Sequence, residues 1–288
     1  MANKPSRKTS ILIIAVIYIL AAFIGYLVHR LFEGMGLLMS VFLADVAATI
    51  VVWLFGVLLK NASVYDPYWS VAPIVILAFW LFQKGGSFAA ADIMLAVAIL
   101  VWGVRLTYNW ALNWQGMDHV DWRYEMLKED NPKIWQLINF GGINMMPTIL
   151  VYLGMIPAYY IIFNQVYIGV RLYIGFAICI LCPAIQLIAD KQMKDFRVHK
   201  EKTSMETGLW KYSRHPNYFG EIMFWWGIFI MYMGTVEYFY KPAAGALLIT
   251  LLFVFISIPM MEKHVLKKYP EYESYQKRVS MVVPWFNR

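Results

Sequence analysis

The strongest constraint on this chain is a series of apolar stretches that are each about twenty residues long. A helix of that length crosses the roughly 30 Å hydrocarbon core of a bilayer. Only 15% of the 288 residues are charged, whereas a soluble domain has about a quarter. The sequence therefore predicts an all-α, polytopic membrane bundle. Its eight expected spans are about 11–32, 37–59, 64–83, 89–112, 140–163, 167–189, 217–240 and 242–261.

Basic residues gather on one side of these spans. If the N-terminus is cytoplasmic, 20 of the 25 Lys and Arg residues fall in cytoplasmic segments, as the positive-inside rule requires. Both termini and the loops 113–139 and 190–216 are then expected on the cytoplasmic face. A bacterial inner membrane is the expected location. Topology explains the net charge of +7, so we expect membrane lipids as partners, no nucleic acid, and a monomer.

The N-terminal apolar stretch resembles a signal peptide, but it lacks a small-residue cleavage site. We therefore expect that it is retained as the first span. The two cysteines, Cys179 and Cys182, lie inside one expected span. Their placement favours buried small residues over a disulfide or a metal site.

The rest of the chain is organised around the stretch GLWKYSRHPNYFGEIMFWWG, residues 208–227. Pro216 predicts the first residue of a helix, where its missing N–H has no partner to lose. The free N–H groups and the dipole of that helix then face Arg214 and His215, which predicts an anion site. For His215, a helix-cap or structural role is the alternative.

Polar residues also follow helical spacing near this point. Asn217 and Glu221 lie four residues apart and share one helix face. A second stripe, spaced i, i+4, i+8 and i+11, consists of Gln186, Asp190, Lys194 and Arg197. This stripe has two interpretations. It is either a helix end whose basic side chains reach solvent, or a functional stripe, because polar groups at membrane depth indicate function.

The third expected span opens with NASVYDPYWS. Asp66 precedes Pro67 and is either a helix N-cap or a functional carboxylate surrounded by aromatic residues, including Tyr68. In the next span Arg105 shares a face with Trp102 and needs an acceptor. Asp66 and Asp45 are the obvious candidates. An architectural ion pair is the alternative.

Two further segments carry open alternatives. In the loop 113–139, Arg123 either contacts an anionic cofactor as part of an interfacial helix or forms a salt bridge at the rim. The acidic residues around His119 are too weak a pattern to predict a metal site. At the end of the last span, Glu262 either pairs with Arg214 or Arg278, or accepts hydrogen bonds from a ribose.

Several motifs together resemble the steroid 5-alpha-reductase-like superfamily. They are GLWKYSRHPNYFGE, MEKHVLKKYPEY, YQKRVSMVVPWF, VYDPYWS, WGVRLTYNW and DWRYE. The chain is most similar to the mostly bacterial branch named as domain of unknown function 1295. More distantly, the RHPNY-type motif resembles isoprenylcysteine carboxyl methyltransferases. This resemblance implies a seven-helix reductase-like core plus one extra N-terminal span. We expect an N-terminal helical hairpin at 1–62, packed on the core, and a steroid-reductase-like membrane domain at 63–288 with its cofactor-binding half at 167–288.

Carried over residue by residue, the resemblance implies cofactor contacts by Asp190, Arg197, Asn217 and Glu221. One position departs from the reductase pattern, because an Asn of the family is Gln186 here.

The substrate half departs further. The reductase Gln–Glu pair that holds a substrate carbonyl appears as Tyr65 and Asp66, its Tyr falls at Trp102, and the histidines of its last helix are Met261 and Glu262.

The resemblance implies an NADPH-dependent reductase of a conjugated double bond in a steroid-like, polyprenoid or fatty-enone lipid. The expected cofactor-binding residues are Arg123, Gln186, Asp190, Lys194, Arg197, Tyr212, Arg214, His215, Asn217, Tyr218, Glu221 and Glu262. The expected catalytic residues are Asp66, Tyr68, Trp102 and Arg105. The alternatives are an S-adenosylmethionine-dependent methyltransferase and a non-enzymatic lipid-binding membrane protein.

Overall fold

A computed structural model describes residues 5–199, 204–236 and 240–286. In these ranges the regular structure is helical, without any strand. Seven helical segments are long and apolar enough to cross a membrane: Arg7–Met35, Leu37–Leu58, Ala62–Lys84, Ala90–Asn113, Trp135–Phe163, Val170–Val198 and Ala243–Lys268. The predicted all-α, multi-pass membrane bundle is therefore confirmed.

The eighth expected span, about 217–240, differs from the prediction. Its helix, α9 (Pro216–Tyr232), has 17 residues and is shorter than the seven segments above. It ends where the chain turns at Met233 and Gly234, so the apolar sequence continues beyond the helix.

The chain divides into two compact units. The first comprises Met1–Gly85 and Trp102–Met155, and the second comprises Gly86–Val101 and Ile156–Arg288. Helices α4 (Ala90–Asn113) and α7 (Met146–Phe163) each contribute one part to either unit.

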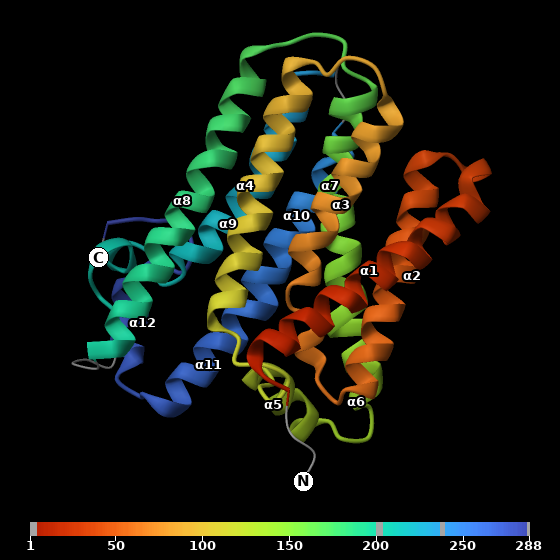
Figure 1. The fold of residues 1–288 in the computed structure, drawn as a ribbon. Coiled ribbons are helices and arrows are strands. Elements are labelled where there is room, and N and C mark those ends of the chain that lie inside the picture. Colours follow the sequence, from red (N-terminus) through yellow and green to blue (C-terminus); the bar gives the residue numbers. More distant parts are fainter. Residues whose placement is uncertain (1–4, 200–203, 237–239, 287–288) are drawn as a thin grey trace. The chain divides into compact units, whose positions relative to one another are not determined.

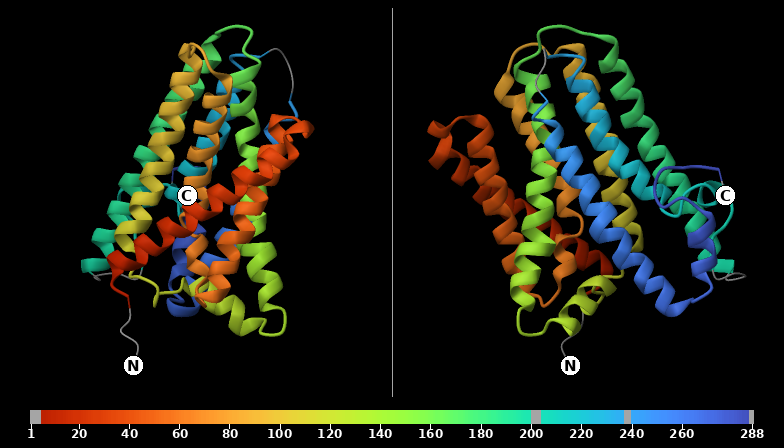
Figure 2. Two further views of the ribbon diagram at one scale, coloured as in Figure 1. Left: turned by 45° about the vertical axis from the view of Figure 1, so that its right-hand side comes forward. Right: turned by 180° about the vertical axis from the view of Figure 1, so that it is seen from behind.

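The first unit begins with the expected hairpin of α1 (Arg7–Phe32) and α2 (Leu37–Leu58), shown in Figures 1 and 2. Between them lies the short helix η1 (Glu33–Met35). Gly36 has a φ of 87°, a value that favours glycine. The expected turn at 33–36 is therefore confirmed.

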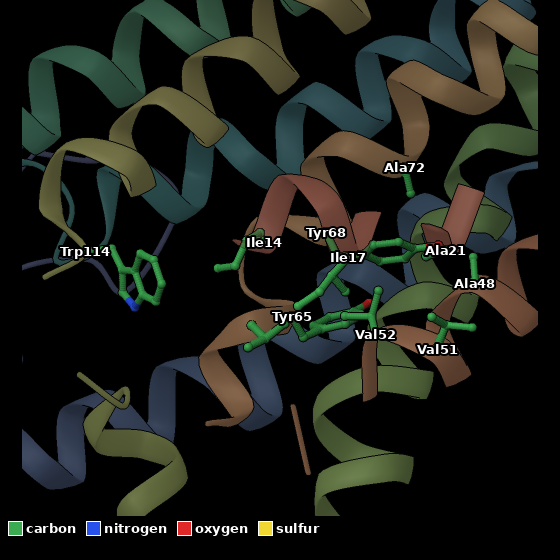
Figure 3. Packing of buried hydrophobic residues seen from close by; sticks show 11 residues of the cluster. Ile14, Ile17, Ala21, Ala48, Val51, Val52, Tyr65, Tyr68, Ala72 and Trp114 are labelled. Carbon is green, nitrogen blue, oxygen red and sulfur yellow. The ribbon is translucent and has the colours of Figure 1, made fainter. Parts of the chain in front are cut away.

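The remaining elements that lie wholly in the first unit follow this hairpin in the sequence. They are η2 (Ala62–Tyr65), α3 (Tyr68–Lys84), α5 (Trp122–Asp130), α6 (Trp135–Leu137) and the π-helical η3 (Ile138–Met145) that leads into α7. The buried cluster drawn in Figure 3 joins α1, α2 and α3, and includes Ile17, Val52, Tyr65 and Tyr68.

The second unit is built on α8 (Val170–His199), which runs beside α9 (Figures 1 and 2). Glycines make this close approach possible, because a Cβ at Gly175 would collide with the backbone of Gly227 and Met231. The last span combines α10 (Ala243–Leu252), the π-helical η5 (Phe253–Ser257) and α11 (Ile258–Lys268). It is followed by α12 (Tyr272–Arg278).

Candidate functional site

Helix α9 begins at Pro216, as predicted, and His215 is its N-cap residue. The chain just before it is fixed to the C-terminal segment. The backbone N–H of Arg214 donates to the carbonyl of Ser280 (2.8 Å), and the Ser213 hydroxyl donates to the carbonyl of Val282 (2.7 Å). The start of α9 is therefore a fixed structural element.

Glu262 of α11 is the acceptor at the centre of this junction. Its carboxylate accepts hydrogen bonds from Arg214 Nε (2.7 Å) and Gln276 Nε2 (2.6 Å). It also makes a 3.0 Å contact with His215 Nε2. Of the alternatives for Glu262, pairing with Arg214 is confirmed, whereas Arg278 pairs with Glu206.

This arrangement changes the expected anion site. The anion that Arg214 and His215 contact is a carboxylate of the protein itself. The contacts therefore favour a structural role for His215. The oxygens of Glu262 accept from protein donors and are not open to a ribose. Tyr212 is exposed and its ring packs on Phe286.

A second polar group lies between α8 and α9. Gln186 and Glu221 are 2% and 3% exposed. The Gln186 amide Nε2 donates to Glu221 Oε2 (2.8 Å), and the indole N–H of Trp225 donates to Glu221 Oε1 (3.0 Å). The structure thus brings together the two residues that sequence analysis placed on separate stripes.

The oxygen of the Gln186 amide has a different environment from its nitrogen. Gln186 Oε1 is buried and has no hydrogen-bond partner within the described part of the chain. An unsatisfied buried polar atom costs about 1–3 kcal/mol, so such an atom in a folded protein calls for an explanation. A bound group that donates an N–H or O–H is one explanation.

The remaining expected cofactor contacts lie along α8 and near the start of α9. Asn217 is one turn before Glu221, and the ring of Tyr218 stacks on His215 with centroids 5.3 Å apart. Along α8, Asp190 is half-buried, whereas Lys194 and Arg197 are exposed. The stripe thus runs from a buried amide to exposed cations, as predicted.

In the first unit, the carboxylate of Asp66 accepts a hydrogen bond from the Tyr124 hydroxyl (2.5 Å). Burial and then the charge of Asp66 raise the pKa of Tyr124 well above its ordinary value, so the phenol stays protonated and donates. Pro67 is the N-cap residue of α3, without any side-chain cap. The N-cap alternative for Asp66 is therefore wrong.

Helix α5 is held at this position by its neighbours. Arg123 forms an ion pair with Asp121 (2.8 Å), which is the rim salt bridge that sequence analysis left open. Burial alone would raise the pKa of Asp121, but the hydrogen bonds and charge of Arg123 lower it below its ordinary value. The Asp121 N–H also donates to the Ser63 hydroxyl (2.9 Å).

The other expected catalytic residues have separate surroundings. Tyr68 donates to Asp45 (2.8 Å), not to Asp66. Trp102 is fully buried and packs edge to face on Trp69, with centroids 6.0 Å apart. Arg105 is also buried.

For Arg105, the sequence pointed to a carboxylate partner in Asp45 or Asp66. The side-chain hydrogen bonds that these two carboxylates accept from described residues come from Tyr68 and Tyr124 instead. Neither carboxylate therefore provides the expected ion pair.

Sequence analysis missed two donors, Tyr124 to Asp66 and Trp225 to Glu221. Signals for both existed: Tyr124 lies in the DWRYE motif, and Trp225 follows Glu221 at the i+4 spacing that places two residues on one helix face.

Comparison with known families decides the classification, because residues 52–279 match the family described as protein of unknown function, DUF1295. The chain belongs to the DUF1295 family. This confirms the expected family. The three polar groups, around Glu262, Gln186 with Glu221, and Asp66 with Tyr124, have these side chains in the matched range, whereas α1 and most of α2 precede it.

Two curated proteins illustrate how this DUF1295 member relates to others. One is an uncharacterized protein, C594.04c, of Schizosaccharomyces pombe, 25% identical over 283 residues, which cover 86% of this chain and 78% of that protein. The other is methanethiol S-methyltransferase 1 of Bradyrhizobium diazoefficiens, 33% identical over 78 residues. That match covers 27% of this chain and 25% of the enzyme. No solved structure matches.

Proposed function

We propose that this protein is an integral-membrane, NADPH-dependent reductase of a conjugated double bond in a lipid. The observation that carries the proposal is the buried Gln186 Oε1 beside Glu221, an acceptor that no described residue satisfies. The carboxamide of a nicotinamide has N–H donors that suit this atom. In the proposed complex Gln186, Asn217 and Glu221 would hold the nicotinamide end.

The charges along α8 suit the other end of such a ligand. Lys194 and Arg197 follow Gln186 by about 12 Å and about 16 Å of helix, at 1.5 Å per residue. Both are exposed, and neither forms an ion pair with a described residue. They are therefore available to the phosphates of NADPH, which Arg and Lys bind well. Asp190, between them and Gln186, would accept from a ribose hydroxyl.

When bound, NADPH would supply a hydride for reduction of the lipid double bond. The chain itself must then provide a proton. Within the first unit, the Tyr124 hydroxyl donates a hydrogen bond to Asp66, where sequence analysis expected Tyr68.

Thermal unfolding of the purified protein, titrated with NADPH and separately with S-adenosylmethionine, tests the proposal. A ligand that binds the native state raises the unfolding temperature. We expect NADPH to do so, and we expect Gln186→Leu and the double variant Lys194→Ala/Arg197→Ala to lose the effect. Arg171→Ala, which removes an exposed cation at the opposite end of α8, is the matched control and should behave as wild type.

A second function has one observation in its favour, the similarity to methanethiol S-methyltransferase 1. If S-adenosylmethionine alone stabilised the protein, the reductase proposal would be wrong and a methyltransferase would replace it. If neither ligand had an effect, both cofactor proposals would be wrong, and a lipid-binding membrane protein would be the alternative. If NADPH binds, the reaction itself is measured by the loss of NADPH absorbance when a polyprenoid or fatty enone is added.

A further inference from the structure

A groove of about 180 Å³ lies in the first unit between α1, α2 and α3. Its lining is almost entirely apolar, and small residues leave the room for it, among them Ala22, Ala48 and Ala72. At Gly25, α1 crosses α2 so closely that an added Cβ would lie 3.0 Å from the carbonyl oxygen of Ala44. The groove is therefore built by helix packing and is no chance gap between long side chains.

The surroundings of the groove are set by the helices that form it. All three are membrane spans, and several of its lining residues are exposed, with Tyr26 at 46% and Val75 at 47%. Exposed side chains on spanning helices face bilayer hydrocarbon. An apolar groove open to hydrocarbon is filled by a hydrocarbon chain.

The length of the groove fits one leaflet. Its lining on α1 runs from Tyr18 to His29, about 16 Å at 1.5 Å per residue. This is half of the roughly 30 Å hydrocarbon core. At the inner end the rings of Tyr18 and Tyr68 meet edge to face, 5.4 Å apart. Their hydroxyls donate to the Val64 carbonyl and to Asp45, so the rings are left to face the groove.

The outer end is polar. His29 contacts the Ser40 hydroxyl (3.0 Å), and next to it Arg30 donates to the Tyr26 hydroxyl (3.4 Å) and pairs with Glu33 (3.1 Å). The Arg30 side chain is 58% exposed. Because α1 ends at Phe32, this guanidinium lies where a span meets the headgroup layer, and a guanidinium suits a phosphate.

We propose that the groove binds one acyl chain of a phospholipid, with the phosphate beside Arg30 and the chain end at Tyr18 and Tyr68. The site is independent of the proposed cofactor. Helix α1 and the part of α2 that lines the groove precede the region that matches the DUF1295 family, whereas the α3 side of the groove lies within it.

Photolabelling in nanodiscs tests the proposal with phosphatidylglycerol that carries a diazirine at the end of one acyl chain. We expect adducts to concentrate around Tyr18, Ala22 and Val75, and excess unlabelled phosphatidylglycerol to suppress them. Ala22→Phe fills the groove and should reduce this labelling at least fivefold. Ala15→Phe, at an exposed alanine of the same helix outside the groove, is the matched control and should change it less than twofold.

Two more variants keep the test decisive. Val75→Trp fills the groove from α3 and should reproduce the effect of Ala22→Phe if that variant unfolds. Arg30→Ala should weaken competition by phosphatidylglycerol severalfold but leave labelling by a diacylglycerol probe unchanged. Three outcomes would overturn the proposal. The first is that adducts spread evenly over exposed α1 residues such as Leu12 and Leu31, and the second is full labelling of both filled variants. The third is a covalent dimer in place of lipid adducts.

Discussion

At the scale of single residues, Glu262 has a structural role, because one carboxylate binds several side chains. From α11, its carboxylate holds Arg214 and His215 just before α9 and Gln276 of α12, and so joins three segments of the second unit. The side chains of Arg214 and Glu262 are each 11% exposed. A buried ion pair adds little when compared with an apolar pair, but removal of one partner leaves the other charge uncompensated.

We therefore expect Glu262→Gln to lower the free energy of unfolding by about 3–5 kcal/mol. Glu206→Gln is the matched control, because its ion pair with Arg278 is much more exposed, and exposed pairs contribute about 0–1 kcal/mol. Titration of the purified protein with SDS, followed by tryptophan fluorescence, measures both. Equal effects of the two variants would contradict a special role for Glu262.

The same residues show what the sequence could predict. Local patterns identified the start of α9 at Pro216 and the polar stripe of α8, because both depend on neighbours within a few turns. The partner of Glu262 remained one of three alternatives. The hydrogen bond of Tyr124 to Asp66 was missed, since it joins residues 58 positions apart and depends on how a loop folds back over a helix start. Such contacts are set by packing, which spacing alone does not encode.

At the scale of elements, α5 is held over the start of α3 by a few polar contacts. The Asn61 side chain donates to the carbonyls of Met117 (2.7 Å) and His119 (3.1 Å), and Ser63 and Asp66 bind the α5 end of the same loop. The residues of α5 are half-buried or exposed. Helix α5 is thus fixed by its hydrogen bonds and ion pair, with little apolar burial.

This predicts a pH dependence for α5. The pKa of Asp121 is lower in the folded protein than in an unfolded chain, so its ion pair stabilises α5 fully above the ordinary value of about 3.9. That stabilisation is lost as the pH falls below this value toward the lower folded pKa. Hydrogen-exchange protection of residues 122–130 should therefore decrease below about pH 4. Asp121→Asn should already show weaker protection at neutral pH and a smaller pH dependence.

The contact of α8 with α9 predicts a different kind of sensitivity. A Cβ at Gly175 would meet backbone atoms of α9, and overpacking costs about 1–3 kcal/mol. Gly175→Ala should therefore lower the unfolding temperature and reduce NADPH binding, since Gln186 and Glu221 face each other across the same pair of helices. Gly141→Ala is the control, because no atom lies within 4 Å of the added Cβ. A neutral Gly175→Ala variant would contradict this packing.

At the scale of the whole molecule, the number of spans decides on which side the two termini lie. Seven segments satisfy both length and hydropathy. If only these crossed, the termini would lie on opposite sides of the membrane. Helix α9 is about 25 Å long at 1.5 Å per residue, close to the roughly 30 Å of hydrocarbon, and many of its residues are buried. The distribution of Lys and Arg favours eight crossings with both termini cytoplasmic.

Cysteine labelling in intact cells distinguishes the two topologies. The native Cys179 and Cys182 are buried, so they give little background. Tyr240→Cys, at a position that is 69% exposed just after the α9 segment, should react with a membrane-impermeant maleimide from outside. Lys211→Cys, exposed just before α9, should react only after permeabilisation. Reaction of both positions from the same side would mean that α9 does not cross the membrane. The C-terminal segment with Glu262 would then be separated from the cytoplasmic face, where we propose that the nucleotide binds.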